Sequence, residues 1–221
     1  VLSINGLKKS ASKLNTPIVS GNVSLYNQTN ELPINPTPVI GMVGSNLDIN
    51  RVLSNKFQNL GDIIISIGES LGPLNSPYFL QDHKITKDIN SYNDLEDIDL
   101  EKELLTANTI RNLTNDNLIQ SCNDISRGGI FISLMKMIKK NYGFTIEFPN
   151  QFDLFCEYIA GYIITVKENN LNKVLAYLSK NCINHSHIGL VSSELIKINS
   201  KKFDYFDIKD KYLNNFEKII N

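Results

Sequence analysis

The chain is poor in cysteine, in net charge and in long apolar runs. Its three cysteines, Cys122, Cys156 and Cys182, are odd in number and form no CxxC pair, which argues against a disulfide framework or a zinc site and favours reduced thiols. The formal net charge of −1, with no basic stretch, excludes a typical nucleic-acid-binding protein. No run approaches the roughly 18 apolar residues of a membrane helix, and no secretory signal is visible. We therefore expect a soluble, cytoplasmic protein with no membrane partner.

The chain nevertheless has enough apolar residues for a sizeable core. Its 221 residues are 42% hydrophobic, which predicts one or two domains. It begins with Val1 rather than methionine and enters a helical pattern at once. We expect it to be a piece of a longer protein.

Apolar periodicity predicts alternating helices and strands. Helices are expected at residues 2–14, 100–117, 130–138, 169–178 and 207–220. Strands are expected at residues 18–19, 39–43, 61–68, 118–122, 144–148, 162–166, 185–191 and 195–198. Residues 27–38 and 81–99 are polar and predict loops. This alternation is typical of an α/β arrangement.

The stretch 17–27, PIVSGNVSLYN, combines a short apolar run with residues able to bind a ligand. Gly21 permits a positive φ or the close approach of a ligand to the backbone. Asn22 offers a carbonyl oxygen, which is a suitable ligand for Mg²⁺. In an extended segment the hydroxyl of Ser24 lies on the same side as Asn22. The alternative is a tight turn between two strands, because Gly-Asn is a common turn pair.

Two strings in this region, SGNVSLYN at 20–27 and PTPVIGMVG at 36–44, resemble the large, ATP-dependent subunit of phosphoribosylformylglycinamidine synthase. In that family the glycine contacts ATP, the asparagine holds Mg²⁺ and the serine contacts the ribonucleotide substrate. The resemblance therefore implies these roles for Gly21, Asn22 and Ser24. It implies no catalytic residue here, because the general base and the acidic Mg²⁺ ligands lie upstream in relatives.

The resemblance also implies a fold. The superfamily includes aminoimidazole ribonucleotide synthetase, whose first domain forms a barrel and whose second lays helices on a sheet. We expect an α/β (α+β) fold of this kind. Residues 1–60 would be the end of the barrel-forming, ATP-binding domain, and residues 61–221 a complete C-terminal α/β domain.

The implied activity is that of a carbon–nitrogen ligase of purine biosynthesis. With ATP and Mg²⁺ it would convert formylglycinamide ribonucleotide to formylglycinamidine ribonucleotide. Ammonia would come from glutamine through a separate glutaminase subunit, with a small bridging subunit as a further partner. We expect the 221 residues alone to be inactive, because the base lies elsewhere.

Three features depart from the family pattern or stay ambiguous. The run DISRGG at 124–129 has Arg127 where relatives carry an acid, and LGPLNSPY at 71–78 lacks the usual Gly-Ser pair. Ser126 or Asp124 is expected to cap the following helix, which would either suit a phosphate or simply pack on a strand. His185 and His187 lie on the same face of a predicted strand. They would either bind a metal together or have a structural role. The alternatives are another ATP-binding enzyme of the superfamily, or a degenerate, non-catalytic interaction module.

Overall fold

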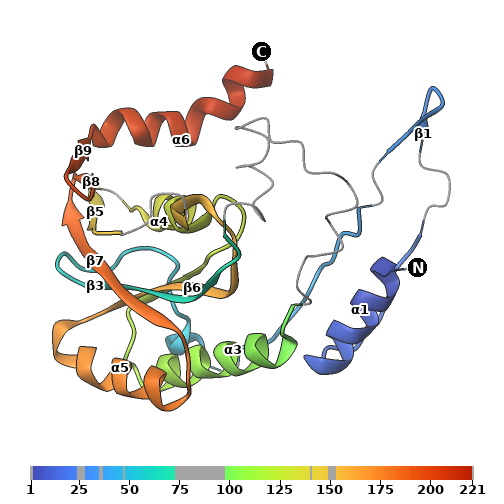
Figure 1. Cartoon of the computed structure of the whole chain (residues 1–221), viewed down its shortest axis with the longest axis horizontal. Coiled ribbons are helices and arrows are strands. Elements are labelled where there is room, and N and C mark those ends of the chain that lie inside the picture. The colour runs from blue at the N-terminus through green and yellow to red at the C-terminus, as the bar shows by residue number, and fades with distance from the viewer. Residues whose placement is uncertain are drawn as a thin grey trace. The chain divides into compact units, whose positions relative to one another are not determined.

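A computed structural model describes residues 2–23, 28–34, 37–46, 48–72, 98–139, 141–148 and 153–220. The chain divides into two compact units, residues 1–50 and residues 51–221 (Figure 1). We call the first the N-terminal unit and the second the sheet unit.

The N-terminal unit begins with the predicted helix, α1, at Leu2–Lys13. Asn15 ends it in a left-handed conformation with φ of 53°, and the N–H of Thr16 donates to the carbonyl of Ala11 at 2.9 Å. This is a common way to satisfy the last carbonyls of a helix. Pro17 follows, which also prevents the helix from continuing.

A small hairpin lies within the segment predicted as a loop at 27–38. Its strands are β1, Gln28–Thr29, and β2, Leu32–Pro33. Asn30 and Glu31 between them both have positive φ, 49° and 67°. A two-residue turn with positive φ at both positions matches the right-handed twist of a hairpin. The loop prediction was therefore wrong for these residues.

The strands predicted at 18–19 and 39–43 are also wrong, because these residues have no regular secondary structure. A strand exists only when a neighbour accepts and donates its backbone hydrogen bonds. Among the described residues, none pairs with either segment. Their apolar side chains are accordingly exposed, with exposed fractions of 91% for Val19, 93% for Val39 and 104% for Val43.

The sheet unit is built on one seven-stranded sheet with the order β4-β6-β3-β7-β5-β8-β9. Neighbouring strands are antiparallel except for β5 and β8, which are parallel. The mixed α and β class is thus confirmed, in its α+β form. The strands are β3 Ile63–Ser70, β4 Ser121–Asp124, β5 Tyr142–Ile146, β6 Tyr158–Val166, β7 His185–Ser193, β8 Ile196–Ile198 and β9 Lys201–Phe203.

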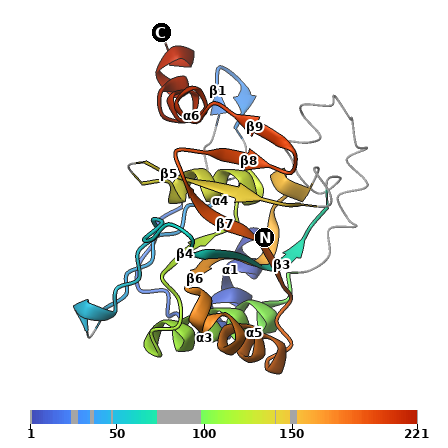
Figure 2. The same ribbon diagram turned by 90° about the vertical axis from the view of Figure 1, so that its left-hand side faces the viewer.

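Helices cover both faces of this sheet. Helix α4 lies on one face, and α3 and α5 lie on the other (Figures 1 and 2). The α-helices are α3 Leu100–Asn115, α4 Gly129–Met137, α5 Leu171–Lys180 and α6 Tyr205–Ile220. Short 3-10 helices are η1 Ile49–Arg51, η4 Asp153–Phe155 and η5 Glu168–Asn170.

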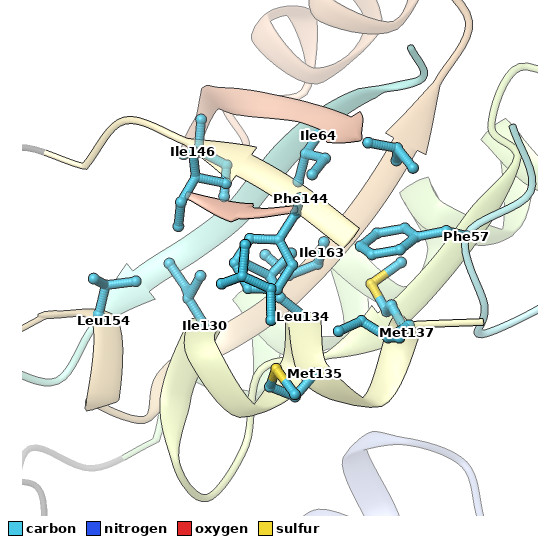
Figure 3. Close-up of a cluster of buried hydrophobic side chains, with 14 of the residues drawn as sticks. Phe57, Ile64, Ile130, Leu134, Met135, Met137, Phe144, Ile146, Leu154 and Ile163 are labelled. Carbon is cyan, nitrogen blue, oxygen red and sulfur yellow. The ribbon is translucent and has the colours of Figure 1, made fainter. Parts of the chain in front are cut away.

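Strand β3 separates two hydrophobic cores because successive side chains point to opposite faces. Ile64 joins the core under α4 with Leu134 and Phe144, part of which Figure 3 shows. Ile65 and Ile67 join the second core, which α3 and α5 cover. All five of these side chains have no exposed surface. Burial on both faces therefore explains why isoleucine fills four of the five positions at 63–67.

The observed start of β4 differs from the predicted one, because the end of α3 includes residues that were predicted to belong to the strand. The strand expected at 118–122 is β4 and begins only at Ser121. Asn117 has φ of 54°, and the N–H of Leu118 donates to the carbonyl of Leu113, so both residues end α3. Strand β9 was not predicted. Most of the loop predicted at 81–99 lies outside the described residues.

Candidate functional site

Gly21 and Asn22, the predicted ATP and Mg²⁺ contacts, lie in an exposed segment without regular secondary structure. A Cβ atom added at Gly21 would meet nothing within 4 Å, and this residue is not among the glycines with positive φ. Neither its backbone conformation nor its packing requires a glycine. Ser24, the predicted substrate contact, lies outside the described residues. The roles of all three residues stay predictions.

The glycines before α4 behave differently, because both have positive φ, 86° at Gly128 and 67° at Gly129. A Cβ at Gly129 would lie 2.5 Å from the carbonyl oxygen of Leu154 in η4. A Cβ at Gly128 would lie 2.4 Å from the side chain of Ile132. Chain geometry and close packing within the protein therefore account for both glycines.

The cap predicted for α4 was wrong. The N-cap residue is Gly128, and no side chain caps the helix. The N–H of Gly129 instead donates to the main-chain carbonyl of Ser126 at 2.9 Å. Because the backbone turns through a left-handed glycine, the side chains of Asp124 and Ser126 are not at the position from which a cap acts.

The histidine pair sits on β7, and no metal centre accompanies it. In the part of the chain that the structure describes, no three His, Cys, Asp or Glu side chains group closely enough to hold an ion. Nδ1 of His185 lies 2.7 Å from the carbonyl oxygen of Ile183. A carbonyl oxygen only accepts, so Nδ1 carries the proton and donates. The structural interpretation of His185 is the better supported one.

None of the three cysteines, Cys122, Cys156 and Cys182, forms a disulfide bond in the structure. Burial, followed by the charge of Asp124, raises the pKa of Cys122 to about 12. Burial, followed by the charge of Asp153, also raises the pKa of Cys156. A thiol reacts and binds metals as the thiolate, which is scarce when the pKa is high. Neither residue is therefore suited to nucleophilic chemistry.

Asp62, directly before β3, is a buried carboxylate that sequence reasoning did not single out. It is 3% exposed, and burial raises its pKa. Nδ2 of Asn59 donates to its Oδ2 at 3.1 Å, which offsets part of that effect. Its main chain contributes as well, because the carbonyl accepts from the N–H of Val191 at 2.9 Å. These contacts position the entry of β3 beside β7.

Comparison with known proteins places the sheet unit in a family. The model of the AIR synthase related protein family, C-terminal domain, matches residues 59–196. The chain belongs to this family. The match begins shortly before β3 and ends at the first residue of β8, so it covers the strands from β3 to β7.

The likeness to curated proteins extends further along the chain than the family model. Over 97% of its length the chain is 33% identical to the phosphoribosylformylglycinamidine synthase subunit PurL of Sulfurovum sp.. This matched region is 29% of that relative, so the chain spans less than a third of its length. The N-terminal unit, with Gly21 and Asn22, therefore lies within the likeness.

Solved structures of Thermotoga maritima PurL share the fold. The complex with FGAR has a TM-score of 0.60 at 12% identity, over 73% of this chain and 30% of the other. The complex with ATP has a TM-score of 0.55 at 10% identity, over 73% and 28%. The PurLQS structure has a TM-score of 0.58 at 11% identity, over 72% and 28%.

Among the described residues, no helix combines the length and the apolar character that crossing a bilayer requires.

Proposed function

We propose that this chain is a C-terminal part of the large subunit of phosphoribosylformylglycinamidine synthase. The observation that supports this most strongly is the 33% identity to a PurL subunit along 97% of the chain. The whole subunit would be an ATP-dependent ligase that converts formylglycinamide ribonucleotide to the amidine in purine biosynthesis. The solved complexes of a protein of like fold with FGAR and with ATP agree with these ligands.

The two units would then have separate tasks in this proposal. Residues 1–60 would complete the ATP-binding domain, and residues 61–221 would form the second domain. The exposed apolar side chains at 18–19 and 39–43 support an incomplete first domain, because strands of that composition are normally buried. Chain outside the 221 residues would supply their neighbours.

Within the first domain, Asn22 would bind Mg²⁺ through its side-chain oxygen, since Mg²⁺ prefers oxygen ligands. The backbone at Gly21 would approach the ATP phosphates, which explains a glycine where packing requires none. Ser24 would contact the ribonucleotide. Mg²⁺ on the phosphates would neutralise the charge that develops when the substrate amide oxygen is phosphorylated.

Ammonia would reach this site from glutamine through a partner. Of the cysteines, Cys122 and Cys156 have raised pKa values, so they do not supply a glutaminase nucleophile. The relative's name describes one subunit of a synthase, and the Thermotoga maritima protein has also been solved as PurLQS. We propose a glutaminase subunit and a small bridging subunit as partners, in the cytoplasm.

The experiment is titration calorimetry of Mg²⁺-ATP into the full-length protein that contains this chain. Asn22→Ala is expected to weaken binding roughly tenfold or more, because a metal ligand is lost. The matched control is Asn214→Ala, which removes an exposed amide from α6 and should leave binding unchanged. Equal binding by the two variants, with both folded, would contradict the role of Asn22.

A turnover assay distinguishes the full-length protein from the 221-residue chain. The full-length protein with ammonia, ATP and Mg²⁺ should form formylglycinamidine ribonucleotide, and the 221-residue chain should not. Turnover by the 221 residues would refute the assignment of the base to another segment. Absence of turnover by the folded full-length protein would favour the degenerate, non-catalytic alternative.

A further inference from the structure

Strand β3 changes character along the face that α4 covers. Ile64 packs into the core with Ile130 and Leu134. Two residues later on that face the side chain is Ser66, which is still only 6% exposed. The opposite face stays apolar, with Ile65 and Ile67 fully buried. A serine at a position where an isoleucine would fill the core leaves room above the sheet.

Small-molecule sites typically have volumes of about 300–1,000 Å³, and the hollow beside Ser66 has a volume of about 560 Å³. Its described lining residues all belong to the sheet unit and include the second half of β3 and the beginning of β7. The side chains that matter for its chemistry are Ser66, Ser70, Asp153, Tyr158, His185 and His187.

Hydrogen bonds within the protein orient several of these groups. The Ser70 hydroxyl donates to Oδ1 of Asp153 at 3.0 Å and accepts from the N–H of Gly72 at 3.0 Å. The bond from Nδ1 of His185 to Ile183 determines which ring nitrogen is protonated. Polar groups held in this way need little reordering when a ligand binds.

The described lining residues disfavour two classes of ligand. No Lys or Arg is among the described residues that line the hollow, whereas the carboxylates of Asp153 and Glu147 are. Phosphate recognition depends on cations, so an anion is disfavoured. The absence of three grouped metal-binding side chains in the described ranges disfavours a chelated cation.

The remaining groups suit hydroxyls. The Asp153 carboxylate only accepts, and the Ser70 hydroxyl, whose proton is donated to Asp153, can accept once more. The Tyr158 hydroxyl can donate, so a ligand hydroxyl finds partners for both of its roles. Burial, followed by the charge of Asp153, raises the pKa of Tyr158, which keeps its phenol protonated and able to donate. The ring of Phe148 adds an apolar surface for C–H groups.

We propose that this hollow binds a neutral, polyhydroxylated small molecule of the sugar class. The described residues that line it all belong to the sheet unit, and the proposal does not depend on the ligase assignment. Asp153, Ser70 and Tyr158 would bind hydroxyl groups, and His187 would lie at the exposed side of the ligand.

NMR titration of the 221-residue chain with D-ribose tests this proposal. The imidazole signals of His185 and His187 should shift and saturate. Ser70→Ala and His187→Ala should each weaken ribose binding roughly tenfold, the loss expected for a hydrogen bond whose partner stays desolvated. Ser193→Ala is the control, because Ser193 is exposed on the same strand but does not line the hollow, and it should bind ribose normally.

Inorganic phosphate and Mg²⁺, each added alone, serve as probes of the two other ligand classes, anions and chelated cations. Saturable shifts with either probe, in the absence of shifts with ribose, would overturn the proposal. Ribose affinity that is unchanged in both lining variants would overturn it as well. The dispersed amide signals of the sheet in each variant show that a lost response is not a loss of fold.

Discussion

The two units of this chain use apolar residues in opposite ways. In the sheet unit, Ile64, Phe144 and their neighbours have no exposed surface. In the N-terminal unit, Val19, Val39 and Val43 are more than nine-tenths exposed, although the local sequence is just as strand-like. The difference teaches that strand composition produces a strand only where a partner is present. The recognisable ligand motif lies in the unit that lacks such partners.

Hydrogen exchange should give the largest contrast between the units. Amides of β3 in the 221-residue chain should open only with global unfolding, at a free energy on the order of 5–15 kcal/mol. Amides at 37–46 should exchange close to their intrinsic rates, because they belong to no ladder or helix. Mass spectrometry of exchanged peptides measures both. Comparable protection at 37–46 and in β3 would contradict the comparison.

Truncation of an apolar side chain should give the second-largest difference between the units, in the free energy of unfolding. Phe144→Ala removes a fully buried ring and should lower the free energy of unfolding by about 3–5 kcal/mol. Val43→Ala truncates a fully exposed side chain and should change it by less than about 0.5 kcal/mol. Urea denaturation followed by circular dichroism measures both. A similar loss in the two variants would mean that Val43 is packed.

Two glycine substitutions sharpen the same contrast. Gly129→Ala combines a positive φ with a backbone collision and should lower the free energy of unfolding by roughly 1–3 kcal/mol. Gly21→Ala meets open space and should leave it unchanged. For ligand binding, Gly21→Ala should have an effect although it has none on stability, because it should weaken Mg²⁺-ATP binding in the full-length protein. If Gly21→Ala destabilises the chain as much as Gly129→Ala does, packing rather than a ligand accounts for Gly21.

The pH dependence of Asp62 should give the smallest effect. Its pKa is raised by burial, so between 3.8 and the raised value the folded state binds more protons than the unfolded state. Its contribution to stability is therefore full below 3.8 and is lost as the pH rises through that window. Asp62→Asn does not titrate, so the wild type should lose stability relative to it over this range. Denaturation curves from pH 3 to 7 measure the difference, and a flat difference would contradict the raised pKa.

Several features of the sheet unit could be predicted because their signals are local. The apolar run 63–67, interrupted only by Ser66 and lying between Gly61 and Gly68, predicted a strand, and the structure confirms it as β3. Asp99 stands directly before the apolar-periodic segment that forms α3, and it caps that helix. Its carboxylate accepts hydrogen bonds from the main-chain N–H groups of Glu101 and Lys102. In both cases the residues that determine the element lie next to one another in the chain.

Other features could not be predicted because they depend on distant residues. The alternation of helices and strands predicted an α/β arrangement but not the direction of its strands, and among the described strands of the sheet only β5 and β8 pair in parallel. Pairing direction is set by which strands meet, and β3 meets β6 and β7, which come about a hundred residues later. The cap of α4 failed for a similar reason, because its backbone path is imposed by contact with η4.

The candidate site shows the same division. Sequence by itself determined the residue types at Gly21, Asn22 and Ser24, and with them a family likeness that the comparisons support along nearly the whole chain. Tertiary structure alone decided which glycines packing requires, which polar side chains gather in one hollow, and which apolar runs become strands. The physical reason is that residue type is a local property, whereas burial and strand pairing are properties of surfaces that only meet once the chain has folded.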